Sequence, residues 1–220
     1  MSPVVLKAAA ACFASALAGF ISPAIASANA CAGYANGRCY SVSDWSPSGS
    51  YTGAFVNLRT DALDYSGSVT ATSTMWVFPT SSSWVEQGVA NDSGTIRWYW
   101  AEVSGLTAKD HYPGLSFSYT TTYGDKISWN APANAWAVYR DGSFVANTTI
   151  NLGASTINET ESGAETTSDA VSIGGEASAM QKRGSDGNWT YNWGGATTHV
   201  QSPLRGGWFT QYADWWYSNP

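Results

Sequence analysis

Three glutamates stand apart because each lies among apolar or small residues, in a sequence of which only 12% is charged. Glu86 lies inside the apolar run from Trp84 to Ala90, Glu102 ends an aromatic segment, and Glu176 follows two glycines. Carboxyl groups that are partly shielded from water have shifted pKa values, which suits them to acid–base chemistry. These three residues are therefore the first candidates for a functional site.

Strand alternation decides which of these side chains could act together. In an extended segment, Glu86 points to one face and Gln87 points to the other. Along the next segment, Trp98, Trp100 and Glu102 share one face. If the two segments pair as a hairpin with their carboxylates on the same side, Glu86 and Glu102 form one acidic patch with aromatic walls.

An acidic, aromatic patch is compatible with two kinds of function. Two neighbouring carboxyl groups can have pKa values pushed apart, so that one donates a proton while the other acts as a base. The same groups suit sugar binding, since sugar faces stack on indole rings and hydroxyls bond to carboxylates. A third interpretation is purely structural, because Trp and Tyr are ordinary strand residues and Glu side chains usually face water.

The elements that would position these residues are short strands joined by tight turns. Period-two alternation recurs between turn signals, as strands require. The expected strands are Ser68 to Phe78, Trp84 to Ala90, Thr95 to Val103, Leu115 to Thr121, Ala135 to Arg140, Ser143 to Ile150, Ala170 to Lys182 and Asn188 to Trp193. Such strand density over roughly 190 residues predicts an all-β fold, a two-sheet antiparallel β-sandwich.

The sequence also predicts how the strands are connected. Asp92-Ser93-Gly94, Asp141-Gly142 and Asp186-Gly187 predict hairpin turns. The stretch from Gly153 to Ser168, rich in Ser, Thr, Glu and Gly, reads as a long exposed loop. The aromatic C-terminus is expected to pack on the sandwich as a last strand.

The first thirty residues read as a secretory signal peptide. Ala8 to Ile25 carries no charge, and small residues allow cleavage after Ala28 or Ala30. We therefore expect residues 31–220 to form one extracellular domain. In an oxidising compartment its two cysteines, Cys31 and Cys39, should form a disulfide.

Charge and composition restrict the partners. Without the leader the chain has nine basic and 16 acidic residues, a net charge of −7, which argues against nucleic acid. No second long apolar run suggests a membrane partner after signal cleavage. No Cys or His cluster has metal-ligand spacing, so we expect no metal and no cofactor. An extracellular polymer, either polypeptide or polysaccharide, is the expected partner.

The segments together resemble the glutamic peptidases, that is, the eqolisins and the neprosin-like group, over roughly residues 69–193. The resemblance is carried, in order, by Trp76-Val77, by Glu86-Gln87-Gly88-Val89, by Trp98-Tyr99-Trp100-Ala101-Glu102 and by Gly175-Glu176. It implies a concanavalin A-like β-sandwich. Glu86 stands where the eqolisins have a catalytic Gln, which implies a Glu–Glu pair like that of neprosin-type enzymes.

The resemblance implies an acid-active peptidase in which Glu86 and Glu176 share a proton and activate water. Substrate contacts would come from Gln87, Trp98, Tyr99, Trp100 and Glu102. Two alternatives stay open at this point. One is a non-catalytic glycan-binding module that uses the three aromatic residues for stacking, and the other is a glycoside hydrolase on the same fold.

Overall fold

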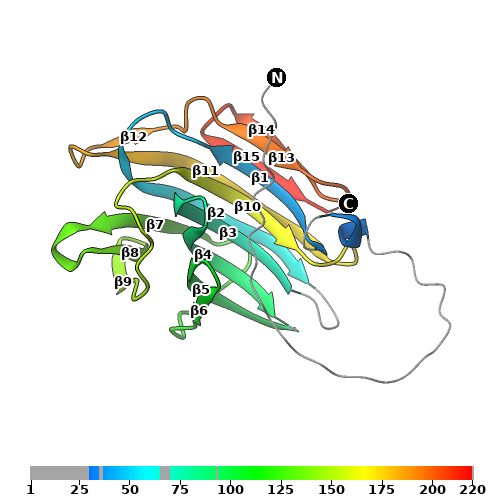
Figure 1. Ribbon diagram of the computed structural model, residues 1–220. Helices are drawn as coiled ribbons and strands as arrows, with labels where there is room; N and C mark the ends of the chain where they lie inside the picture. Colours follow the sequence, from blue (N-terminus) through cyan, green and yellow to red (C-terminus); the bar gives the residue numbers. More distant parts are fainter. Residues whose placement is uncertain (1–29, 35–36, 65–69, 93, 220) are drawn as a thin grey trace.

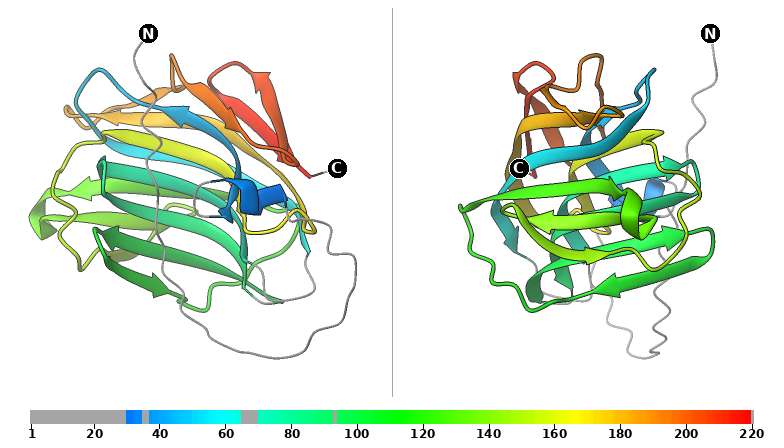
Figure 2. Two further views of the ribbon diagram at one scale, coloured as in Figure 1. Left: turned by 45° about the vertical axis from the view of Figure 1, so that its right-hand side comes forward. Right: turned by 90° about the vertical axis from the view of Figure 1, so that its left-hand side faces the viewer.

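The computed structural model of the protein describes residues 30–34, 37–64, 70–92 and 94–219. Two antiparallel sheets stack face to face, as Figure 1 and the turned views in Figure 2 show. This confirms the predicted two-sheet β-sandwich. Residues 1–29 of the predicted signal peptide lie outside the described residues. Within the described part of the chain, no helix is both long and apolar enough to cross a membrane.

One sheet has seven strands and carries the segment with Glu86. In spatial order they are β13 (Thr197–Val200), β1 (Cys39–Trp45), β10 (Glu159–Thr166), β3 (Thr70–Thr80), β4 (Ser83–Asp92), β5 (Thr95–Ser104) and β6 (Thr107–His111).

The other sheet has eight strands. In spatial order they are β14 (Arg205–Thr210), β15 (Asp214–Ser218), β11 (Ser172–Gly184), β2 (Tyr51–Asp64), β7 (Thr122–Asn130), β8 (Ala135–Arg140) and β9 (Ser143–Asn147), with β12 (Trp189–Tyr191) paired to β11. Short 3₁₀ turns occur at η1 (Ala30–Gly33) and η3 (Ala131–Ala133).

The main core lies between the sheets, because alternate residues of each strand point inward. Val85 and Val89 of β4 meet residues of the opposite sheet such as Val56 and Ile127. The other side of the seven-stranded sheet, here called the outer face, has its own apolar cluster. Its buried members are Val42, Trp76, Trp84 and Val103.

The predicted turns and the disulfide are confirmed. Asp141-Gly142 joins β8 to β9, and both residues have positive φ. β4 and β5 pair as the predicted hairpin, with Asp92 opposite Thr95. Cys31 and Cys39 form a disulfide that ties η1 to the start of β1.

Two predictions about the elements are wrong. The stretch Gly153 to Ser168 is not one exposed loop, because residues 159–166 form β10, paired on both sides by β1 and β3. Conversely, Leu115 to Thr121 forms no strand and instead crosses from β6 to β7. Within this segment Phe117 packs edge-on against Tyr119, and no strand of the described chain pairs with it.

Candidate active site on the outer face

The strand register aligns acidic and aromatic side chains in one row across the outer face. Glu161 of β10 pairs with Trp76 of β3, and Trp76 pairs in turn with Glu86 of β4. On the far side of Glu161 the row continues to Asp44 of β1. Residues two strands apart in one register row lie about 10 Å apart at their Cα atoms. Glu86 and Glu161 therefore flank a single indole and point to the same side.

Glu86 is half-buried and accepts hydrogen bonds from two ring donors. Trp84 Nε1 donates to Glu86 Oε2 at 3.0 Å, and the Tyr99 hydroxyl donates to Glu86 Oε1 at 3.1 Å. Tyr99 also shares a hydrogen bond with Thr74 Oγ1 at 3.1 Å. Burial raises the pKa of Glu86, while the two donated bonds lower it. Burial also raises the pKa of Tyr99 well above its usual value.

Glu161 is half-buried among other carboxyl groups. Burial raises its pKa well above the usual value, and the charges of Asp44 and Glu159 raise it further. One carboxylate oxygen from each of these three residues lies within 4.8 Å of the other two. Three oxygen ligands of this type could contribute to a site for a hard divalent cation.

Tyr40 of β1 connects the two carboxyl groups electrostatically. Burial raises the pKa of Tyr40 to about 12 although the charge of Arg38 lowers it, and the charges of Glu161 and Glu86 both add to the rise. The neighbouring Glu165 forms an ion pair with Arg38. The Tyr40 hydroxyl thus lies in the field of both carboxyl groups.

Other predicted site residues face the core instead. Trp98 and Trp100 are 1% and 3% exposed and belong to the cluster between the sheets. Gln87 is fully buried on the same side, and its amide atoms have no hydrogen-bond partner among the described residues. Because Glu86 pairs with Ala101 and not with Glu102, the two carboxylates point to opposite sides of the sheet. Among the predicted substrate-contact residues, Tyr99 lies with Glu86.

Glu102 performs a structural task in this position. It is fully buried and accepts hydrogen bonds from the backbone N–H groups of Thr149 and Ile150 at 2.6 and 2.7 Å. The Thr149 hydroxyl and His111 Nε2 lie within bonding distance of its other oxygen. Glu102 therefore ties the segment after β9 to β5.

The structure does not bring Glu176 and Glu86 together. Glu176 lies on β11 of the eight-stranded sheet and forms an ion pair with Arg59 at 3.2 Å. Its neighbours Ile173 and Ala177 belong to the core, so Glu176 points away from the seven-stranded sheet. Two packed sheets, themselves about 10 Å apart, separate it from Glu86. One water molecule cannot contact both carboxyl groups across that distance.

Sequence reasoning missed Glu161 because the segment around it reads as polar loop. A usable signal was present, because acidic residues and glycine alternate with small residues from Glu159 to Thr166. In the structure, the alternate residues Thr160 and Ser162 are buried and donate hydrogen bonds to backbone carbonyls of β3. Period-two alternation without apolar residues was therefore still a strand pattern.

Several solved structures have a fold similar to that of this chain. The sandwich is similar to those of solved glutamic peptidases. A crystal structure of scytalido-glutamic peptidase with a peptide-based transition state analogue superposes with a TM-score of 0.62 at 10% sequence identity, covering 83% of this chain and 98% of that one. SCP-B, a member of the eqolisin family in complex with the tripeptide Ala-Ile-His, gives 0.59 at 8% identity with the same coverage.

At such low identity the likeness shows the fold alone. It confirms that the chain has the β-sandwich expected from the resemblance to glutamic peptidases. No protein-family model and no curated protein matches the sequence. The function is therefore argued from the site itself.

Proposed function

We propose that the protein is a secreted, acid-active endopeptidase in which Glu86 and Glu161 form the catalytic pair. The observation that carries this proposal is their placement in one register row on the outer face, on either side of Trp76. The Cys31–Cys39 disulfide supports an extracellular site of action, because such bonds persist in oxidising compartments.

The surroundings of the two carboxyl groups suggest different roles for them. The hydrogen bonds from Trp84 and Tyr99 stabilise the charged form of Glu86. The nearby Asp44 and Glu159 destabilise the charged form of Glu161. In mildly acidic solution, Glu86 is then the carboxylate that accepts a proton and Glu161 the carboxylic acid that donates one.

The reaction follows from these protonation states. Glu86 takes a proton from water as the water oxygen bonds to the peptide carbonyl carbon, while Glu161 donates its proton to the carbonyl oxygen. The resulting tetrahedral diol collapses as the C–N bond breaks. The leaving nitrogen takes the proton held by Glu86, and a hydroxyl proton of the diol returns to Glu161. Both carboxyl groups end in their starting states.

Two glycines lie in the adjoining row, on either side of Thr74. Gly163 of β10 and Gly88 of β4 both pair with Thr74 of β3. A strand position without a side chain often marks a place where another backbone approaches closely. Here the approaching backbone is that of the neighbouring strands, since a Cβ at Gly88 would lie 2.1 Å from the carbonyl oxygen of Ser73 and one at Gly163 would lie 2.1 Å from that of Ser41.

The test is cleavage of a denatured protein substrate between pH 3 and 7. We expect Glu86→Gln and Glu161→Gln each to lower kcat at least a hundredfold, because each removes one proton-transfer group. Glu176→Gln, on the opposite sheet, serves as the matched control and should stay within twofold of the unaltered protein. Equal cleavage by all four proteins would remove the proposal. Retained activity in Glu86→Gln alone would contradict the role of Glu86 as the base.

The glycan-binding alternative required exposed aromatic rings on β5 for sugar stacking. Trp98, Tyr99 and Trp100 are all at most 5% exposed, so none presents a ring face to a sugar.

A further inference from the structure

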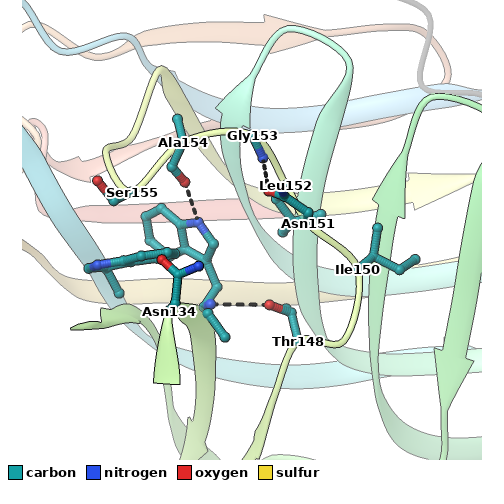
Figure 3. Close-up of a pocket in the computed structure, with 11 residues that line it drawn as sticks. Asn134, Thr148, Ile150, Asn151, Leu152, Gly153, Ala154 and Ser155 are labelled. Carbon is teal, nitrogen blue, oxygen red and sulfur yellow. Dashed lines mark hydrogen bonds between the residues drawn. The ribbon is translucent and has the colours of Figure 1, made fainter. Parts of the chain in front are cut away.

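A pocket separate from the acidic row lies at an end of the eight-stranded sheet. It is a pocket of about 340 Å³ between the end of β7, the start of β8 and residues 148–155 (Figure 3). That volume falls in the range of small-molecule sites. The pocket is unrelated to the peptidase proposal, because Glu86 and Glu161 lie on the outer face of the other sheet.

The wall of the pocket is held in place before any ligand arrives. Trp136 Nε1 donates a hydrogen bond to the Ala154 carbonyl at 2.9 Å, and the Trp136 backbone N–H donates to Thr148 Oγ1 at 3.1 Å. Ser83 of the other sheet donates to the carbonyl of Leu152 at 2.6 Å. Together with the bonds from Thr149 and Ile150 to Glu102, these contacts fix residues 148–155. A preformed wall spares a ligand the entropic cost of ordering it.

The lining combines the ring of Trp129 with uncharged polar groups, whereas Trp136 is 1% exposed and supports the wall from within. None of the described residues that line the pocket carries a charge. Trp129 is half-buried and packs edge-on against Trp136. Beside the rings lie the Asn134 carboxamide and the Ser155 hydroxyl, which Figure 3 shows near the indole bonded to Ala154.

Asn134 is a built feature of this pocket. It is exposed and has φ 48° and ψ 46°, in the left-handed region that Asn tolerates better than most residues. In the described part of the chain, no group forms a hydrogen bond with its carboxamide. The carboxamide is therefore available to a ligand, as both donor and acceptor.

The indole ring and the uncharged polar groups together indicate which class of ligand suits the pocket. The absence of charge in the lining gives no preference for an ionic ligand, and the amide and hydroxyl groups disfavour a purely apolar one. A pyranose ring has an apolar face that can stack on the partly exposed Trp129 indole, and its hydroxyl groups both donate and accept hydrogen bonds. We propose that the pocket beside Asn134 binds a neutral sugar unit.

The test is a titration of the purified protein with glucose, galactose, mannose and N-acetylglucosamine, followed by calorimetry and by saturation-transfer NMR. At least one sugar should bind saturably. Asn134→Gly should weaken that binding at least tenfold, because glycine keeps the positive φ and removes the carboxamide. Asn192→Gly is the matched control, since Asn192 also has positive φ but lies outside the pocket. It should bind within twofold of the unaltered protein.

Three outcomes would overturn the proposal. The first is that no sugar binds saturably up to a concentration of about 50 mM, at which a sugar with a Kd of about 1 mM would saturate the site. The second is equal binding by the Asn134→Gly and Asn192→Gly variants, with both showing unchanged thermal unfolding. The third is equally tight binding of N-acetyl-asparagine amide, which would assign the pocket to a peptide side chain. The Glu86→Gln variant should bind sugar normally, so this proposal can fail or hold independently of the peptidase.

Discussion

At the scale of single residues, Glu86 depends on a short chain of hydrogen bonds. Thr74 bonds to the Tyr99 hydroxyl, which donates to Glu86, while Trp84 donates to the other oxygen. Donors that point at a carboxylate favour its charged form and also fix its direction. Tyr99 is thus a positioning residue that acts through Glu86.

This arrangement predicts the behaviour of Tyr99→Phe. Loss of the donated bond raises the pKa of Glu86, so the base ionises only at higher pH. The acidic limb of the kcat profile should move to higher pH, while kcat at its maximum falls less than tenfold. The control is Tyr139→Phe on β8, which should leave the profile in place. An unmoved acidic limb in Tyr99→Phe would contradict the role of Tyr99.

At the scale of elements, the proposed site depends on β10, because this strand carries Glu161, the partner of Glu86. Its outer side carries Glu159, Glu161 and Glu165, whereas its inner side carries small residues that fit against the core. Because β10 lies between β1 and β3, Glu161 is brought into the middle of the sheet. A loop in this place would leave Glu86 without a partner.

The close packing of β4 against β3 predicts a strict requirement for glycine at position 88. Gly88 has φ 158°, and a Cβ there would lie 2.1 Å from the carbonyl oxygen of Ser73. Gly88→Ala should therefore lower the free energy of unfolding by about 3 kcal/mol or more, from strain and overpacking combined. The measurement is chemical denaturation. Gly33→Ala, where a Cβ meets nothing within 4 Å, should change stability by less than about 0.5 kcal/mol.

At the scale of the whole molecule, burial raises the pKa values of several carboxyl groups, which favours their protonated forms in the folded state. Asp125 on β7 is buried, which raises its pKa to about 7 despite the nearby charge of Arg140 and a bond from Trp98 Nε1 at 3.4 Å. Burial also raises the pKa values of Glu86, Glu161 and Asp110. These four carboxyl groups therefore bind protons more tightly in the folded state than in the unfolded chain.

This tight proton binding predicts greater stability in acid. Between the unfolded pKa of Asp125, near 3.8, and the folded value of about 7, the folded state holds a proton that the unfolded state has lost. The free energy of unfolding should then fall as the pH rises through this window, by at most about 4 kcal/mol from this residue. Denaturation of the unaltered protein and of Asp125→Asn at pH 4 and 7.5 measures it. An equally steep fall in both would contradict the assignment to Asp125.

The sequence by itself determined the architecture of this protein. Alternation and Asp-Gly turns depend on neighbours along the chain, so β4, β5, β8 and the turns between strands could be predicted. The pairing of Cys31 with Cys39 could also be predicted, because the third cysteine, Cys12, lies in the predicted signal peptide. Glu86 was found for the same local reason, since it is a charge inside an apolar strand.

Only the tertiary structure decided which residues Glu86 meets. Face and partner depend on register between strands that are distant in sequence, and a shift of one residue exchanges the two sides. That register turned Glu102 into the core, placed Glu176 on the far sheet, and brought Glu161 from a segment that composition marked as a loop. A buried polar strand is stabilised by neighbours on both sides, and the sequence of β10 alone does not contain them.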